Sequence, residues 1–133
     1  MNRFTKFLYA FIMVVVFTLS TAFSQCPNGT YLNIVINPDQ YPQETSWALL
    51  NGNLDTIVTG GPYTDIIDYS PQVTQLCVPN GDYYFEIYDE YGDGMQGSLW
   101  GGQDGSYYLL RCNDTIVEMD SANFGTYAYH GFT

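Results

Sequence analysis

A short acidic loop carries the residues of this sequence whose chemistry is easiest to recognise. Asp89 and Asp93 lie four residues apart, and Gly92 and Gly94 flank the second carboxylate. Calcium takes about six to eight oxygen ligands, and glycine allows the positive φ angles that turn backbone carbonyls toward an ion. Two carboxylates at this spacing on a glycine-rich turn predict a Ca²⁺ site in which Asp89 and Asp93 are ligands.

The loop matches only part of an EF-hand. Asp89, Asp93 and Gly94 fit positions 1, 5 and 6 of that loop. Tyr91 and Trp100 stand at positions 3 and 12, where an oxygen ligand and a bidentate glutamate belong. An ordinary Asp-Gly turn between strands is the alternative explanation. If the site is real, further oxygens are expected from the backbone carbonyls of Tyr91 and Met95, from Asp104, and from the distant pair Asp39 and Glu44.

Aromatic side chains near this loop are the candidates for contacting a ligand. The sequence contains thirteen Tyr, eight Phe and two Trp. Aromatic faces stack on sugar rings, and Tyr and Trp are favoured at interfaces because one end is apolar and the other polar. The alternation of side chains in strands places about half of the tyrosines in the core. The rings expected to contact a ligand are Trp100, Tyr91, Tyr107 and Tyr108.

The sequence offers no recognisable catalytic set. His130 is the only histidine, and it lies in an alternating C-terminal segment typical of a sheet. Gly-x-Ser-x-Gly does not occur. Paired carboxylates are numerous enough for a glycosidase, but a domain this small leaves little depth for a substrate cleft. We therefore expect a protein that is not an enzyme and has no catalytic residues.

The first 24 residues are expected to be a cleaved secretory signal peptide. Arg3 and Lys6 precede an apolar run, residues 7–19, and small residues follow it. A retained membrane anchor is the weaker interpretation, because a span needs about 20 apolar residues. We predict a secreted or cell-surface protein with a single domain over residues 25–133 and no membrane contact after cleavage.

The charge of the mature chain excludes two classes of partner. Cleavage leaves Arg111 as the only Lys or Arg beside fourteen Asp and Glu. Such a surface repels phosphate backbones and anionic head groups, so we expect neither nucleic acid nor a membrane surface as partner. Acidity of this kind also keeps an extracellular protein soluble, and bound cations would stabilise a fold with crowded carboxylates.

Three cysteines follow the signal segment, which predicts one disulfide and one free thiol in an oxidising compartment. A bond between Cys26 and Cys77 would tie the start of the domain to a strand in mid-chain. A bond between Cys77 and Cys112 would join two expected strands. We favour Cys26–Cys77, although the spacing alone does not decide the pairing.

Short β-strands are the elements that must position these residues. Pro, Gly and Asn interrupt the chain about every 8–12 residues, and no segment keeps a helical period. The expected strands cover residues 31–37, 45–50, 55–59, 72–78, 82–88, 106–112, 115–120 and 125–132. Strands of this length in one small domain predict an all-β fold, a single antiparallel β-sandwich that is jelly-roll-like.

Four motifs occur in order along the chain: a "YPxETSW" turn at residues 41–47, a "DxYGDG" loop at 89–94, "GSY" at 105–107 and "FG" at 124–125. With these motifs the sequence resembles a β-sandwich domain found in secreted and surface proteins of bacteria and some algae. The resemblance implies the fold and a metal loop, but no particular activity. Many members carry cysteines directly after "GDG", where this chain has Met95 and Gln96, which leaves their disulfide pattern open here.

These features together predict a secreted, calcium-stabilised module without catalytic activity that binds or adheres to a glycan or another cell-surface component. The alternative is a self-associating structural subunit of an extracellular fibre or surface layer. Its support is the spare cysteine and the tyrosine-rich strands, whose edges could pair between molecules.

Overall fold

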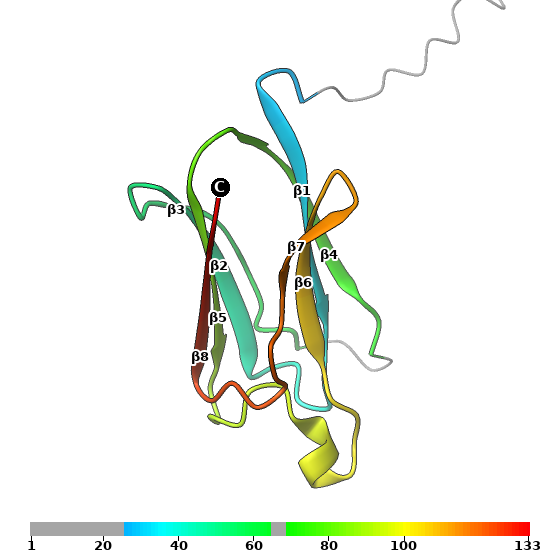
Figure 1. Cartoon of the computed structure of the whole chain (residues 1–133). Coiled ribbons are helices and arrows are strands. Elements are labelled where there is room, and N and C mark those ends of the chain that lie inside the picture. Colours follow the sequence, from blue (N-terminus) through cyan, green and yellow to red (C-terminus); the bar gives the residue numbers. More distant parts are fainter. Residues whose placement is uncertain (1–25, 65–68) are drawn as a thin grey trace, which may run out of the picture.

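The structure, a computed structural model, describes residues 26–64 and 69–133, so the expected signal peptide lies outside it. Each strand expected from the sequence is present, with bounds that differ by two residues at most (Figure 1). The elements are β1 (Gly29–Asn37), β2 (Thr45–Asn51), β3 (Thr56–Gly60), β4 (Gln72–Pro79), β5 (Tyr83–Asp89), the 3₁₀-helix η1 (Gly97–Trp100), β6 (Ser106–Arg111), β7 (Asp114–Glu118) and β8 (Tyr127–Phe132). Among the described residues, no helix has the length and apolar character to cross a bilayer.

The strands form two four-stranded sheets with the orders β4-β1-β6-β7 and β3-β2-β5-β8. All strand pairs are antiparallel. β2–β3 and β6–β7 are hairpins within one sheet, and the other connections pass from one sheet to the other. The two sheets face each other in Figure 1. The predicted antiparallel β-sandwich is therefore confirmed.

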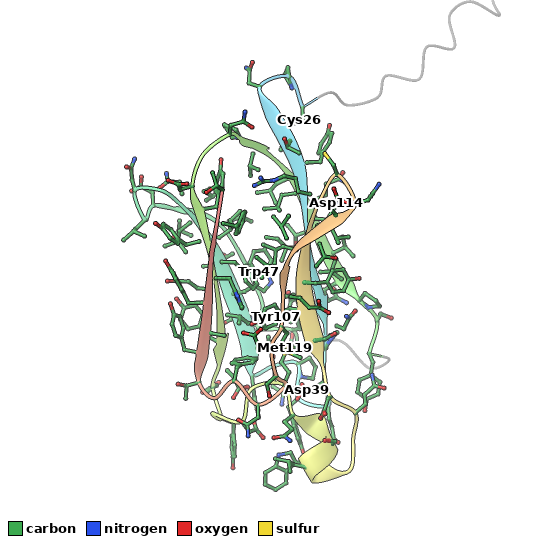
Figure 2. The ribbon with its side chains drawn as sticks, in the orientation of Figure 1. Cys26, Asp39, Trp47, Tyr107, Asp114 and Met119 are labelled. Atoms are coloured by element: carbon green, nitrogen blue, oxygen red, sulfur yellow. A yellow bond between two sulfur atoms is a disulfide. The ribbon has the colours of Figure 1, made fainter. Side chains whose placement is uncertain are left out.

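Alternating side chains fill the space between the sheets. Trp47 and Leu49 point inward from β2, and Phe85 and Ile87 do so from its partner β5. Trp47 lies between the sheets in Figure 2, and its indole contacts the Phe85 ring at a centroid distance of 5.9 Å. Burying one such side chain contributes about 1.5–3 kcal/mol relative to leaving it exposed. The other sheet contributes Leu32, Ile34, Ile36, Val78, Tyr107, Leu109 and Val117.

A disulfide joins the segment just before β1 to the end of β4. Cys26 and Cys77 form this bond with their Cα atoms 5.5 Å apart, as the sequence analysis favoured. Cys112 is an exposed free thiol in the β6–β7 turn. In Figure 2, Cys26 lies at one end of the sandwich and Asp39 at the other.

Three connections meet at the end of the sandwich that carries Asp39. Backbone hydrogen bonds join the β5–β6 connection to the β7–β8 connection through Met95 N–H and the Ala122 carbonyl, 2.8 Å apart. The β5–β6 connection also joins the β1–β2 connection through Glu90 N–H and the Glu44 carbonyl, 3.1 Å apart. η1 lies at the tip of this end (Figure 1). The acidic loop is therefore held between two segments that are distant in sequence.

Candidate metal centre

Asp89 organises the acidic loop from the end of β5. Its side chain lies on the inward face of the strand, is only 4 % exposed, and accepts the backbone N–H groups of three loop residues at Oδ1. Those of Asp93 and Gly94 lie at 3.1 and 3.2 Å. Gly92 and Gly94 have φ angles of 91° and 72°, which residues with a Cβ rarely adopt. The glycines therefore let the chain wrap around one carboxylate oxygen.

Gly94 also permits a close approach of two loops. A Cβ at this position would lie 2.3 Å from the carbonyl oxygen of Ala122, which belongs to the β7–β8 connection. Real Cβ atoms do not approach a backbone oxygen this closely, so a side chain here would force the loops apart. The sequence signal for this constraint is the second glycine of the "GDG" motif.

Three carboxylates converge at this end of the sandwich. Glu44, Asp89 and Asp93 each offer one oxygen, and these oxygens lie within 4.8 Å of one another. Glu44 comes from the segment before β2, and the pairing of β2 with β5 sets its neighbour Thr45 directly opposite Asp89. The predicted ligands Asp89, Asp93 and Glu44 are thus brought together, and we refer to them as the carboxylate cluster.

Asp39 lies close to the cluster but outside its group of convergent oxygens. Its side chain is buried, and Oδ1 accepts the N–H of Tyr41 at 2.9 Å. Burial raises the pKa of Asp39, the Tyr41 N–H opposes this, and the charges of Asp89 and Asp93 raise it further. Asp39 is therefore near enough to feel the cluster's charge, but its carboxylate is not one of the three that converge.

The electrostatics of the cluster are unfavourable without a cation. Burial raises the pKa of Asp89 against the opposing hydrogen bonds from Gly92 and Gly94. Burial also raises the pKa of Glu44, and repulsion from neighbouring carboxylates adds to the shift. Among residues 26–64 and 69–133 the only Lys or Arg is Arg111. Its guanidinium donates to the carbonyl of Thr133 and lies over the Phe132 ring, away from the cluster.

A buried hydroxyl beside the cluster has no hydrogen-bond partner. Thr45 is 1 % exposed, and its Oγ1 is unsatisfied. Thr45 and Asp89 are opposed residues on the inward face of paired strands, where Cβ atoms lie about 4.5–5.5 Å apart. A buried unsatisfied hydroxyl in a native protein calls for an explanation such as a bound ion or water. Its place next to Asp89 fits an oxygen-seeking ion in the cluster.

Two further predicted ligands have other roles within the loop. Asp104 is exposed, and its Oδ1 accepts the N–H of Ser98 at 2.9 Å. Hydrogen bonds from the Ser98 hydroxyl and amide hold the pKa of Asp104 below its ordinary value. The carbonyl of Met95 accepts the N–H of Gly105 at 2.8 Å, and the Met95 side chain is fully buried. Both residues therefore order the β5–β6 connection, and neither belongs to the carboxylate cluster.

Two of the four aromatic candidates lie at the cluster. Trp100 donates its indole N–H to Asp93 Oδ2 at 2.8 Å. Together with Tyr91, Tyr41, Glu44 and Asp93, it lines a cavity of about 220 Å³. Tyr41 was missed by the sequence analysis, although it stands in the same "YPxETSW" turn as Glu44.

The other two aromatic candidates lie elsewhere. Tyr107 is 1 % exposed and its hydroxyl bonds His130 Nε2 at 2.7 Å, so its ring belongs to the core and the expectation of ligand contact is corrected. Tyr108, the next residue in β6, is half-buried on the outward side of its sheet and does not line the cavity. Successive side chains of β6 point to opposite faces of the sheet, and Tyr107 lies on the inward face.

No family model, curated protein or solved structure matches the chain. Its function is therefore inferred from the geometry of this site alone. The cluster is reached from two sides: Glu44 and Asp93 line the aromatic cavity, and Glu44 and Asp89 line a second hollow of about 390 Å³. An ion could enter from either side.

Proposed function

We propose that the chain is a secreted, calcium-binding β-sandwich that acts as a binding or adhesion module without catalysis, with carbohydrate as its ligand class. The observation that carries the proposal is the convergence of Glu44, Asp89 and Asp93 to within 4.8 Å without a Lys or Arg partner among the described residues. The disulfide between Cys26 and Cys77 supports an oxidising extracellular compartment.

The chemistry of the donors favours calcium over other common metals. All three members of the cluster supply carboxylate oxygens, which hard cations prefer, and zinc and copper sites usually include His or Cys. Calcium tolerates irregular geometry and about six to eight ligands, whereas magnesium demands a near-ideal octahedron. The cluster, Asp39 and loop carbonyls or water would supply these oxygens for a calcium ion.

Coulomb repulsion gives the size of the effect that an ion would relieve. Two carboxylate charges 4.8 Å apart repel by about 3.5 kcal/mol at an effective dielectric constant of ~20. A divalent cation turns this repulsion into attraction at three carboxylates simultaneously. Extracellular calcium sites typically have dissociation constants of about 10⁻⁴–10⁻³ M, so an exported domain would hold its ion and depend on it for stability.

The proposal includes no catalytic step. His130 is packed edge-on against Tyr107 and bonded to its hydroxyl, and burial lowers its pKa. These contacts with Tyr107 hold the His130 ring between the two sheets. The carboxylate cluster is better suited to holding a cation than to general acid and base roles, because its members share one small volume and the same charge.

Calorimetric titration of calcium into the purified protein tests the metal assignment. We expect one ion per chain, and at least tenfold weaker binding by Glu44→Gln, because Glu44 is the ligand contributed by the segment distant from the loop. Glu118→Gln is the matched control, since Glu118 is exposed on β7. An absence of binding heat, or equal affinity for the Glu44→Gln variant, would contradict the proposal.

A structural subunit of a fibre or surface layer is the second candidate. β8 is an edge strand of its sheet, and unpaired edges are templates for pairing with another chain. Cys112 adds an exposed thiol that could bridge two molecules. Sedimentation of the purified protein separates the two candidates, because a subunit of this kind forms polymers and a binding module stays monomeric.

A further inference from the structure

The cavity beside the carboxylate cluster has walls that a metal ion alone does not require. Three of its five lining residues are aromatic: Tyr41, Tyr91 and Trp100. Tyr91 is 75 % exposed and Trp100 57 % exposed. Exposed apolar side chains that gather beside polar groups are typical of a ligand-binding groove, whereas singly exposed ones are not. At about 220 Å³ the cavity is smaller than the ~300–1,000 Å³ sites of drug-sized molecules, so it fits one small unit.

The part of the wall formed by η1 is held in place before any ligand arrives. Trp100, the last residue of η1, is fixed by its hydrogen bond to Asp93. Gly101 caps the end of η1 with a φ of 85°, and its N–H donates to the Gly97 and Ser98 carbonyls. Asp104 caps the same turn through Ser98. Such preorganisation lowers the entropic cost of binding.

From this arrangement we infer that the cavity binds a single neutral sugar residue through direct coordination to the ion, an inference that rests on the proposed calcium site. Two adjacent hydroxyls of the sugar would complete the coordination shell, because three carboxylates supply fewer oxygens than calcium takes. The C–H face of the sugar ring would pack on Trp100 and Tyr91. A single sugar residue would thus contact both the ion and the aromatic wall of the cavity.

The charge of the occupied site selects among ligand classes. Three carboxylates and one divalent ion leave a net negative charge, and Asp39 nearby adds to it. An acidic sugar or a phosphate would meet repulsion from the remaining carboxylate charge. An organic cation would compete with calcium for Glu44 and Asp93 instead of joining it. A neutral polyol can coordinate the ion through its hydroxyls and is not repelled by the surrounding carboxylate charge.

The test titrates methyl α-D-mannoside, methyl α-D-galactoside and methyl α-L-fucoside into the purified protein, in about 5 mM calcium and in a chelator. This concentration exceeds the ~10⁻⁴–10⁻³ M dissociation constants typical of extracellular sites. We expect saturable binding of at least one glycoside with calcium, and at least tenfold weaker binding in the chelator. Tyr91→Ala should weaken this binding at least tenfold at saturating calcium. Tyr129→Ala, which removes another exposed tyrosine, on β8, is the control and should bind as the wild type does.

A separate calcium titration makes the two proposals distinguishable. Calcium binding without binding of any of the three glycosides would overturn the sugar inference and leave the metal site intact. Absence of calcium binding would overturn both. Glycoside binding of equal strength in the chelator, or binding that Tyr91→Ala leaves unchanged, would also overturn the inference, as would choline binding that calcium suppresses in place of any sugar.

Discussion

Replacing Asp93 by asparagine is expected to remove most of the calcium dependence of the protein's thermal stability. In the wild-type protein, calcium should raise the melting temperature, because the ion binds the folded cluster and not the unfolded chain. Asparagine keeps an oxygen that can accept the Trp100 indole N–H, so the change removes one charge and leaves the loop contact. The variant should melt above the wild type in a chelator and below it in calcium.

The magnitude follows from the cluster's geometry. At 4.8 Å, the largest separation among the three oxygens, a carboxylate pair repels by about 3.5 kcal/mol at an effective dielectric constant of ~20, and solvent screening of the partly exposed Asp93 reduces the relief on neutralising it to ~1 kcal/mol. Calcium at a hundred times its dissociation constant stabilises the folded state by about 2.7 kcal/mol. In a domain of about 100 residues this amounts to a rise of roughly 10–20 °C.

Circular dichroism melts in calcium and in chelator measure both effects. Asp114→Asn is the matched control, since Asp114 is exposed and lies at the opposite end of the sandwich from Asp39 (Figure 2). The control should keep the wild-type calcium shift, and Asp93→Asn should lose most of it. A wild-type melting curve that calcium does not move, or a full shift in the Asp93→Asn variant, would refute the reasoning.

Three further outcomes are expected. In a chelator, the free energy of unfolding should rise as the pH falls from neutral toward the ordinary carboxyl pKa near 4. Burial raises the pKa of Asp89, so the folded state takes up more protons than the unfolded state over this range. Chemical denaturation at several pH values measures this change. A stability that falls over that range would contradict the electrostatic account. Gly94→Ala should lower the free energy of unfolding in urea by about 2 kcal/mol or more, because φ at this position is 72° and the added Cβ would clash with the Ala122 carbonyl. An unchanged urea midpoint would refute this. Replacing Cys26 and Cys77 together by serine should cost about 2–4 kcal/mol in the same assay, and a change below that range would show that the bond contributes little.

The fold was predictable because its signals are local. Turn residues end each strand, and the alternation in β2, with Trp47 and Leu49 facing inward, specifies a sheet with one buried face. The pair Asp89 and Asp93 was predictable for the same reason, since both lie within one glycine-rich turn. Such features depend on neighbours in sequence and not on how the sheets are assembled.

The composition of the site was less predictable, because it depends on strand pairing and register. Glu44 joins Asp89 only because β2 pairs with β5 so that Thr45 opposes Asp89. Asp104 is held by Ser98 inside its own loop, a local contact that competes with metal ligation. Tyr107 faces the core because of the register of β6, and alternation alone could not say whether it or its neighbour would do so.

Luminescence from terbium bound in place of calcium is the most direct measurement of the central claim, that Glu44, Asp89 and Asp93 hold one divalent ion. Terbium takes oxygen ligands as calcium does and emits when a nearby indole transfers energy to it, and the Trp100 indole is bonded to Asp93. We predict sensitised emission that calcium displaces, that Glu44→Gln abolishes and that Trp100→Phe weakens, because Tyr41 and Tyr91 line the same cavity and also transfer energy. Absence of sensitised emission, or emission that Glu44→Gln leaves unchanged, would contradict the account.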